Sequence, residues 1–410
     1  MLITSCSNEV NLQLREENTL SILFTGFTSC DFDNFLVYFS EKYPSVSLIF
    51  LSHDNEHNHN SEHADTSRDQ EIIEMVISGK YKADLLVYNS LQAYRYINAG
   101  IIEDLANYAV LEAAVNNSEL LDGVSNICYH DGFYYGVPIQ INYQGYIINK
   151  DLFNKFSLPL PEKEWTYDDY YNLAIEASKQ DAVQNKLAFL LSSERERFQF
   201  INVALGVNVL NGYNFNFNTI EFIDYMKKGY MLFTSGLYYQ IDHNVLEPNN
   251  VLIDERFLLN TIYYDSLHDY KNKSELFKNQ AIIHTPLTIQ PGVYTNSLMI
   301  SIIKDTKNIE MAATLLNEFF NEEYQRQYAS EMMLYKDKDR YEIMCMISDN
   351  IEEWIIDNTR YALTAIYPDE LITWLDANIY DQLSSGAIDF KDCGSIIQNK
   401  AMKIYEYLNE

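Results

Sequence analysis

The order of apolar segments in the first ninety residues constrains the fold more than any other feature of the chain. Three short runs of β-branched and aliphatic residues, typical of buried strands, alternate with two stretches in which apolar side chains recur at helical spacing. We expect strands at residues 20–26, 46–51 and 83–88, and helices at 32–43 and from about 72, the second with Gly79 just beyond it as its C-cap. This alternation predicts a parallel α/β sheet.

A similar pattern restarts in the middle of the chain. Thr166, with Asp169 three residues further on, predicts a helix N-terminus with a capping box. Further helices are expected at 220–233 and from 309, the second capped by Asn308. Strands are expected at 257–264 and 281–285, and the chain after about 340 is expected to be mainly helical. For a chain of 410 residues, two stretches of α/β pattern indicate two domains.

The net charge limits the partners that the chain can bind. Its formal value is −30, from 59 acidic and 29 basic residues. Such a surface repels phosphate backbones, so we expect no nucleic-acid partner. Solubility explains the charge most simply, and a cationic ligand such as a polyamine is the alternative. The sequence contains no run approaching the roughly 18 apolar residues that a membrane-spanning helix needs.

The five cysteines are too few for a disulfide scaffold and include no C-x-x-C pair. Four are expected to be buried thiols, namely Cys30, Cys128, Cys345 and Cys393. The fifth, Cys6, follows Leu2-Ile3-Thr4-Ser5, which is similar to the end of a lipoprotein signal peptide. We therefore expect Cys6 to carry a lipid anchor, followed by a polar tether.

The segment His53–His63 holds four histidines and several carboxylates within eleven residues. These side chains are zinc ligands in many proteins, so a metal-capture protein is one alternative function. The segment lacks aliphatic anchors that would orient such ligands. We expect a solvated loop there, and no metal site.

Several segments resemble, in the same order, the extracellular solute-binding protein family 1, the group that includes maltose-binding proteins. Asp131–Pro138 and Tyr146–Phe153 look like the family's crossing between lobes, dGkhYGhP…hhYNkdhF, in which h is hydrophobic. Ala83–Val87 resembles its PDhhh strand with alanine in place of proline, and Glu164–Asp169 has Trp-Thr where the family has Thr-Trp. Further similar segments are Tyr43–Leu48, Ala99–Leu105, Ile302–Ala312 and, more loosely, Ile396–Ala401.

The resemblance implies an α/β, two-lobed, periplasmic-binding-protein-like (type II) fold with an inter-lobe ligand cleft and a hinge. It places a signal remnant and tether at 1–18, lobe one at 19–137 plus 295–337, and lobe two at 138–294 plus 338–410, with crossings near Pro138–Gln144, Pro291–Thr295 and Tyr335–Lys338. It also implies the substrate-binding component of a bacterial ABC importer. Such a protein is expected to be a monomer on the extracellular face of the membrane that delivers a small solute to a permease.

Catalytic signatures are missing from the sequence, which has no G-x-S-x-G, H-E-x-x-H, G-x-x-x-x-G-K or G-x-G-x-x-G motif. We therefore expect a binding protein with no catalytic residue and no cofactor. A glycoside-acting hydrolase is the alternative, because 59 acidic residues readily supply carboxylate pairs. The 33 tyrosines and 21 phenylalanines favour an oligosaccharide ligand, since aromatic faces stack on sugar rings, while peptides and polyamines stay open.

The expected ligand-binding residues follow strands or lie on the first crossing. Loops after strands form the cleft edge of an α/β lobe, and alternate residues of an extended crossing point the same way. Trp374 is added because maltose-binding proteins place a sugar-stacking aromatic in this C-terminal region, although Leu371 and Leu375 favour a core role equally. The full set is Phe27, Thr28, Ser29, Asn89, Ser90, Gln140, Asn142, Tyr143, Tyr263, Asp265 and Trp374.

Overall fold

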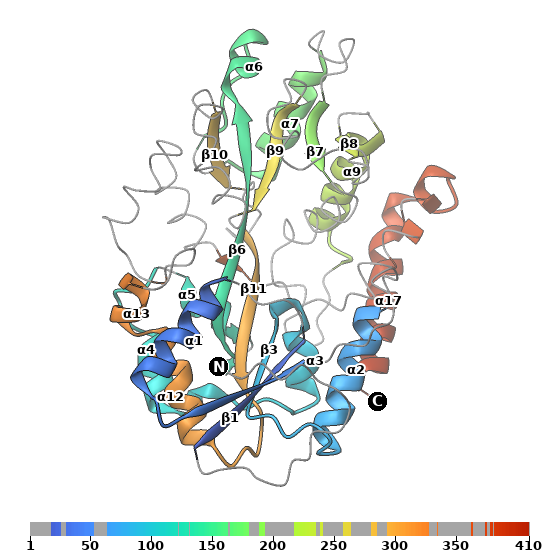
Figure 1. The fold of residues 1–410 in the computed structure, drawn as a ribbon. Coiled ribbons are helices and arrows are strands. Elements are labelled where there is room, and N and C mark those ends of the chain that lie inside the picture. The colour runs from blue at the N-terminus through green and yellow to red at the C-terminus, as the bar shows by residue number, and fades with distance from the viewer. Residues whose placement is uncertain are drawn as a thin grey trace. The chain divides into compact units, whose positions relative to one another are not determined.

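The described part of the chain forms two compact units in this computed structural model (Figure 1). Unit 1 consists of Met1–Ile141, Asn296–Lys336 and Leu408–Glu410, and unit 2 of Asn142–Thr295 and Asp337–Tyr407. The predicted lobe limits stay a prediction, because compact packing alone does not show that two units close on a ligand. The structure describes residues 18–25, 30–52, 64–121, 123–130, 132–162, 165–179, 188–192, 217–234, 238–240, 257–263, 280–284, 293–327, 334, 362–363, 374, 378–379 and 381–409.

Unit 1 is built on a sheet whose central strand is parallel to its neighbours on both sides. Strand β1 (Thr19–Phe24), which is buried throughout, pairs in parallel with β2 (Ser47–Ser52) and with β3 (Leu85–Asn89). On the far side of β3, strand β11 (Val293–Ile302) returns antiparallel, with Ile302 opposite Leu85. The predicted parallel strand–helix arrangement of the first ninety residues is confirmed.

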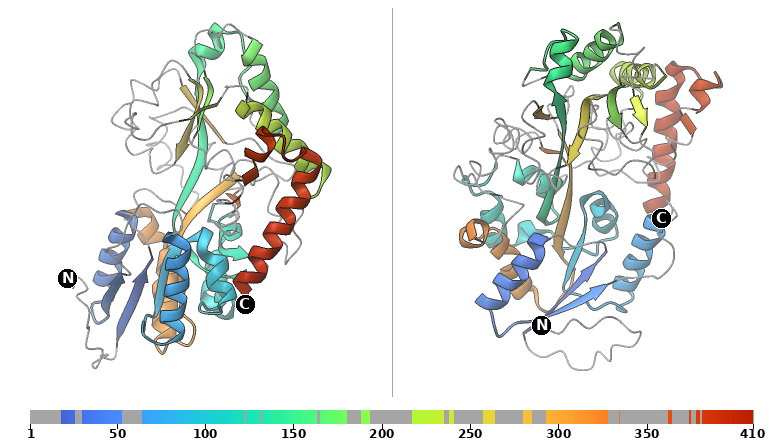
Figure 2. Two further views of the ribbon diagram at one scale, coloured as in Figure 1. Left: turned by 90° about the vertical axis from the view of Figure 1, so that its right-hand side faces the viewer. Right: turned by 45° about the horizontal axis from the view of Figure 1, so that its top comes forward.

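The helices of unit 1 cover both faces of this sheet. The chain moves from β1 to β2 in one direction and from β2 to β3 in the other, so right-handed crossovers place the connecting helices on opposite faces. Helix α1 (Cys30–Lys42) accordingly lies on one face and α2 (Ala64–Ile77) on the other, as Figure 2 shows. Helix α2 begins well before the predicted residue 72, because the apolar stripe that revealed it occupies only its second half.

Shorter elements complete unit 1. They are η1 (Ser90–Gln92), α3 (Ala93–Asn98), η2 (Leu105–Asn107), α4 (Ala109–Val115), α5 (Val124–Cys128), β4 (Tyr129–His130), β5 (Phe133–Tyr134), α12 (Ile309–Phe319) and α13 (Glu322–Gln327). Helix α12 packs on α1 through stacked rings, with the Phe35 and Phe319 centroids 3.6 Å apart. Gly79 takes a positive φ of 69° just beyond α2, as predicted for a C-terminal glycine.

The predicted capping role of Asn308 is wrong. Asn308 precedes α12, but its side chain makes no capping hydrogen bond. Its Nδ2 instead donates to the carbonyl oxygen of Thr19 at 2.9 Å and to Oδ1 of Asp84 at 3.2 Å. The physical reason is the buried Asp84 carboxylate, whose other oxygen accepts from the backbone N and the Oγ of Ser21 at 2.8 and 2.7 Å. A buried carboxylate needs such donors more than an exposed helix end does.

The described strands of unit 2 include both parallel and antiparallel pairs. Strand β6 (Val137–Asn149) begins in unit 1 and pairs antiparallel with β9 (Phe257–Tyr263) and β10 (Gln280–His284). The bounds of β9 and β10 agree with the predicted strands to within one residue. The other strands of unit 2 are β7 (Ala188–Ser192), parallel to both β9 and β8 (Tyr238–Gln240), and β12 (Ala362–Leu363), parallel to β11 at Val293 and Tyr294.

The described helices of unit 2 are α6 (Lys150–Lys155), α7 (Tyr167–Lys179), α9 (Ile220–Thr234) and α17 (Phe390–Asn409). Helix α9 matches the predicted span to one residue. The predicted capping box of α7 is confirmed, since the Thr166 backbone N donates to Oδ2 of Asp169 at 2.7 Å and the Asp169 N donates to Oγ1 of Thr166 at 3.3 Å. Trp165 packs edge-on against Tyr146 and Tyr170 in the core below.

Two of the predicted buried thiols are confirmed. Cys128 and Cys393 are both buried and unoxidised, and burial raises the pKa of each, that of Cys393 to about 11. A raised pKa keeps the thiol protonated and unreactive. The side chain of Cys30 and all of Cys345 lie outside the described residues, as does Cys6.

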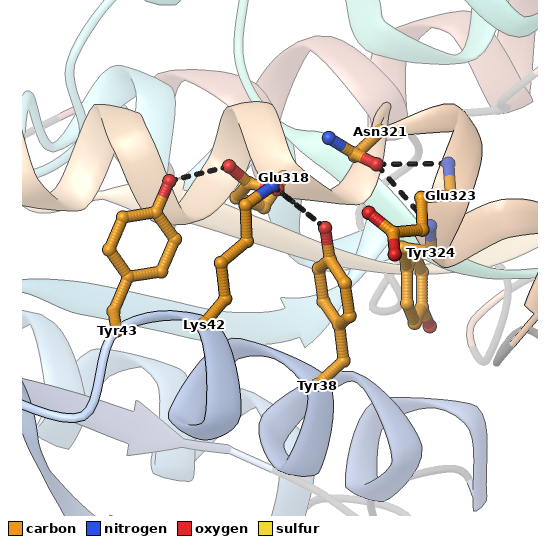
Figure 3. A network of polar contacts seen from close by, with 7 residues as sticks. All are labelled: Tyr38, Lys42, Tyr43, Glu318, Asn321, Glu323 and Tyr324. Atoms are coloured by element: carbon orange, nitrogen blue, oxygen red, sulfur yellow. Dashed lines mark hydrogen bonds and ion pairs between the residues drawn. The ribbon is translucent and has the colours of Figure 1, made fainter.

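A buried glutamate joins α1 to α12 (Figure 3). Oε2 of Glu318 accepts from Nζ of Lys42 at 2.8 Å and from the Tyr38 hydroxyl at 3.0 Å, while Oε1 accepts from the Tyr43 hydroxyl at 2.6 Å. Burial alone would raise the pKa of Glu318, but the hydrogen bonds from Lys42, Tyr43 and Tyr38 outweigh it and lower that pKa. The carboxylate therefore stabilises unit 1 in its charged form.

We expect Glu318→Gln to reduce the free energy of unfolding at neutral pH by about 1–3 kcal/mol, the usual cost of disrupting hydrogen bonds to a buried charged group. Since the pKa of Glu318 is lowered on folding, its contribution is present above the ordinary value of 4.5 and is lost as the pH falls through the folded value. Urea unfolding at a series of pH values should therefore show that the free energy of unfolding falls less steeply with decreasing pH in the variant than in the wild type. Glu323→Gln, at an exposed position of α13, is the control, and equal losses in both variants would contradict this role.

Helix α17 approaches residues 217–218 of unit 2 through a glycine. A Cβ added at Gly394 would lie 2.2 Å from the carbonyl oxygen of Phe217 and 3.0 Å from the Cα of Asn218. These neighbours are backbone atoms, so a side chain at this position requires the helix to move.

We expect Gly394→Ala to destabilise the protein by about 1–3 kcal/mol, as overpacking does. The sign of the change in unfolding free energy tests the close approach, because alanine in place of glycine within an unobstructed helix stabilises the helix by roughly 1 kcal/mol. Denaturant unfolding measures the change. Asn399→Ala, at an exposed position of the same helix, is the control and should leave stability unchanged or raise it. A stability gain in Gly394→Ala would show that the close approach does not hold.

Candidate ligand-binding site

The carboxyl ends of β1 and β3 lie together at one edge of the unit 1 sheet, because the two strands are parallel neighbours. Thr25 follows β1 directly, and its backbone N and Oγ1 both donate to the carbonyl oxygen of Val87 in β3, at 3.0 and 3.2 Å. Asn89, a predicted ligand residue, is the last residue of β3 and is half-buried. Phe27, Thr28 and Ser29 lie outside the described residues. Parallel strand ends of this kind are the usual ligand edge of an α/β unit.

Gln92 joins these two strand ends. Its Oε1 accepts from the backbone N of Asn89 at 3.0 Å and lies 3.4 Å from Oγ1 of Thr25, whose single proton is shared between this oxygen and the Val87 carbonyl oxygen. Its Nε2 donates to Oδ1 of Asp69 in α2 at 2.8 Å. Our sequence reasoning missed Gln92, although a glutamine three residues after a strand-terminal asparagine can turn back to that residue's N–H, as in a capping box.

Asp69 is buried and anchors a small polar cluster. Its Oδ2 forms an ion pair with the guanidinium of Arg95, and its Oδ1 also accepts from the hydroxyl of Tyr96 at 2.8 Å. Burial, together with the negative charge of Asp69, raises the pKa of Tyr96 well above its ordinary value, so this hydroxyl stays a donor. The strand ends with Thr25, Asn89 and Gln92 form what we call the polar edge of unit 1. The bonds to the buried Asp69 charge hold this edge in one arrangement.

Ser90, another predicted ligand residue, is fully buried beside the same edge. Its Oγ accepts from the backbone N of Ser297 in β11 at 3.0 Å, which ties the end of β3 to the returning strand. Its role in ligand binding stays a prediction. The Oγ of Ser297 is buried and has no hydrogen-bond partner within the described part of the chain.

The first crossing begins on a tightly packed glycine. A Cβ at Gly136 would lie 2.8 Å from Oγ of Ser301 and 3.1 Å from the carbonyl oxygen of Ile300, so only glycine fits against β11. Four residues on, Gln140 is half-buried between the buried Ile139 and Ile141. The alternation places the Gln140 side chain on the face opposite to these apolar residues.

Three further predicted residues occupy strands, and nothing is described of their side chains. Asn142 and Tyr143 lie in β6, and Tyr263 ends β9. The register pairs Tyr263 with Gln144, which brings it close in the sheet to Tyr143. Asp265 lies outside the described residues.

Trp374 is helical and half-buried, so it is neither a fully enclosed core residue nor a free surface ring. The Nζ of Lys400 lies 5.6 Å from its ring centroid, a cation–π distance. Asn378 Nδ2 donates to the Trp374 carbonyl oxygen at 2.7 Å. Leu371 and Leu375, on which the core interpretation depended, lie outside the described residues.

Neither a metal site nor a membrane span is found in the part of the chain that the structure describes. Within it, no group of three or more His, Cys, Asp or Glu side chains is arranged to hold a metal ion. The segment His53–His63 lies outside it. None of its helices combines the length and the apolar composition that crossing a membrane requires.

Solved structures share this fold. The sugar-binding protein MalE from Xanthomonas citri superposes with a TM-score of 0.74 at 11% identity, covering 95% of this chain and 98% of that one. The substrate-binding protein Lmo0181 from Listeria monocytogenes, solved with cycloalternan, gives 0.66 at 16% identity, covering 95% and 100%. The cyclic alpha-maltosyl-1,6-maltose binding protein from Arthrobacter globiformis gives 0.69 at 13%, covering 95% and 99%. The chain thus has the two-lobed α/β fold of solute-binding proteins.

The sequence itself also matches a protein family. No curated protein sequence matches significantly. A family model described as bacterial extracellular solute-binding protein matches residues 52–335, well over half of the chain. This range contains β3 with Asn89 and Gln92, the Asp69 cluster, and strands β6 and β11, each of which has residues in both units. The predicted family resemblance is confirmed, and the chain belongs to the bacterial extracellular solute-binding proteins.

Proposed function

We propose that this protein captures an oligosaccharide outside the cell and delivers it to the permease of an ABC importer, without chemical conversion. The family match over residues 52–335 carries the proposal. The choice of ligand is supported by structures of the same fold whose names record sugar ligands, including cycloalternan and cyclic alpha-maltosyl-1,6-maltose. An Agrobacterium radiobacter protein of this fold, at 15% identity and a TM-score of 0.63, holds ribitol, so polyols belong in the same test.

The polar edge of unit 1 suits a ligand rich in hydroxyl groups. Asn89 at this edge and Gln140 on the first crossing are half-buried amides, and an amide group both donates and accepts hydrogen bonds. Sugars are bound by a few such groups together with aromatic faces. Trp374 and Tyr143 are our candidates for the aromatic contribution.

The two units act, in this proposal, as the lobes of a hinged receptor. Capture requires that the ligand-bound, closed arrangement be favoured over the open one by the contacts that the ligand adds. The protein works as a monomer, and a lipid on Cys6 holds it at the outer face of the membrane. Mass spectrometry of the native membrane fraction tests this anchor, and an unmodified Cys6 in an intact chain would contradict it.

A thermal-shift screen tests the proposed ligand class. We expect the melting temperature to rise with one or more of maltotetraose, cycloalternan and ribitol, because a ligand that binds only the folded state stabilises it. Peptides, polyamines and zinc form the comparison set. Chromatography after incubation should recover the stabilising compound unchanged. Its conversion to products would identify a hydrolase, and stabilisation by zinc alone would support metal capture.

The Trp374→Ala variant tests whether this ring contacts the ligand. We expect it to weaken saccharide binding by about 1–3 kcal/mol, the range for losing a large apolar contact. Calorimetric titration measures the affinity, and Trp374→Phe, which keeps an aromatic face, should recover part of it. If Trp374→Ala folds and binds with unchanged affinity, the ring has a packing role only.

A further inference from the structure

The Gln92 side chain adds a polar link between the two strand ends of unit 1 at which ligands are expected, beside the direct bonds from Thr25 to the Val87 carbonyl oxygen. Oε1 of Gln92 accepts hydrogen bonds from the Asn89 backbone at the end of β3 and from Thr25 at the end of β1. A water molecule could accept from the same two donors, but the Gln92 oxygen is covalently tethered and is held in place by the bond from Nε2 to Asp69. The sheet pairing fixes the two strands up to Phe24 and Val87, and the Gln92 amide orders the residues that follow them, Thr25 and Asn89.

The orientation of that amide is determined by α2. Nε2 of Gln92 donates to Oδ1 of the buried Asp69, so a flipped amide would place its oxygen against a carboxylate and its NH₂ against the Asn89 N–H. Arg95 and Tyr96 in α3 hold the same carboxylate from other directions. Hydrogen bonds to charged groups are stronger than those between neutral groups. The amide thus has one favourable orientation, and its oxygen faces the strand ends.

Building on the proposed function, we propose that Gln92, held by Asp69, is a positioning residue for ligand binding. It preorganises the carboxyl ends of β1 and β3, including the backbone of Asn89, and it need not touch the ligand itself. Ordering such an edge in advance removes a cost that would otherwise be subtracted from the binding free energy. When only a fraction of the protein molecules has this edge in the binding-competent arrangement, the apparent affinity equals the intrinsic affinity multiplied by that fraction.

Gln92→Met tests this role, because methionine keeps the length and approximate volume of glutamine and loses every hydrogen bond. Gln70→Met is the matched control: Gln70 lies beside Asp69 in the sequence, but its side chain is exposed and bonds only to Glu74 among the contacts described. Thr25→Val is a second, milder variant: it keeps the shape of threonine, removes the hydroxyl contact with Gln92 and with the Val87 carbonyl oxygen, and leaves the Asn89 bond to Gln92 in place. The probes are maltotetraose and cycloalternan, with binding measured by stopped-flow mixing and calorimetry.

We expect Gln92→Met to raise the dissociation constant about tenfold and Thr25→Val about threefold. The change should come mainly from a slower association rate, since a competent edge is populated less often. A purely structural role would lower the melting temperature and leave the binding of the folded protein unchanged. Affinity of Gln92→Met within twofold of the wild type, with Gln70→Met likewise unchanged, would overturn the proposal.

Hydrogen exchange in the ligand-free protein gives an independent reading. The segment 85–92, which contains the Asn89 amide, should exchange about tenfold faster in Gln92→Met, while segments of α12 keep their wild-type rates. If neither saccharide binds the wild-type protein, the proposed ligand class is wrong, and this exchange measurement alone decides the positioning role. Unchanged exchange at 85–92 would then refute it.

Discussion

The parallel pairing of β1 with β2 on one side and β3 on the other is the constraint on which unit 1 depends. Its register aligns Thr19 with Ser47 and Ile22 with Leu85, so the carboxyl ends of the strands meet at one edge. Parallel strands must be joined by crossovers, and these supply the helices that bury both faces of the sheet. The polar edge is a consequence of this topology, because the carboxyl ends of parallel neighbouring strands lie on the same side of the sheet.

Buried carboxylates hold unit 1 together around that sheet. Asp84 binds Ser21 and Asn308 near the amino ends of the strands, and Asp69 holds Gln92 near their carboxyl ends. Glu318 joins α1 to α12 on one face. A buried charge is costly unless it is satisfied, so each carboxylate specifies its partners closely. Apolar contacts such as Phe35 against Phe319 supply cohesion, whereas the carboxylates determine which elements meet and in what orientation.

Capture of a solute by a hinged protein requires rigid binding edges as well as mobile connections. In unit 1, Gln92 is tied to Asp69 of α2, and Ser90 is tied to Ser297 of β11. Tyr96 of α3 holds the same Asp69 carboxylate. Unit 1 also has half-buried amide side chains at Asn89, which ends β3, and at Gln140 in β6. A rigid edge with a few available polar groups can discriminate between ligands at a small entropic cost. This is consistent with membership of a family whose members bind solutes.

Local patterns in the sequence were enough to predict most elements of the fold. Strand alternation, helical periodicity, the Thr166–Asp169 capping box and Gly79 all depend on residues within a few positions of one another, and the structure confirms each of them. The contacts around Gln92, Asn308 and Glu318 were not predicted, because they join residues as far as 289 positions apart and depend on the tertiary fold. Sequence alone thus determined the class of fold, the family and candidate strand ends. Only the tertiary structure decided which polar side chains support those ends, because a buried carboxylate takes its partners from whatever elements folding brings beside it.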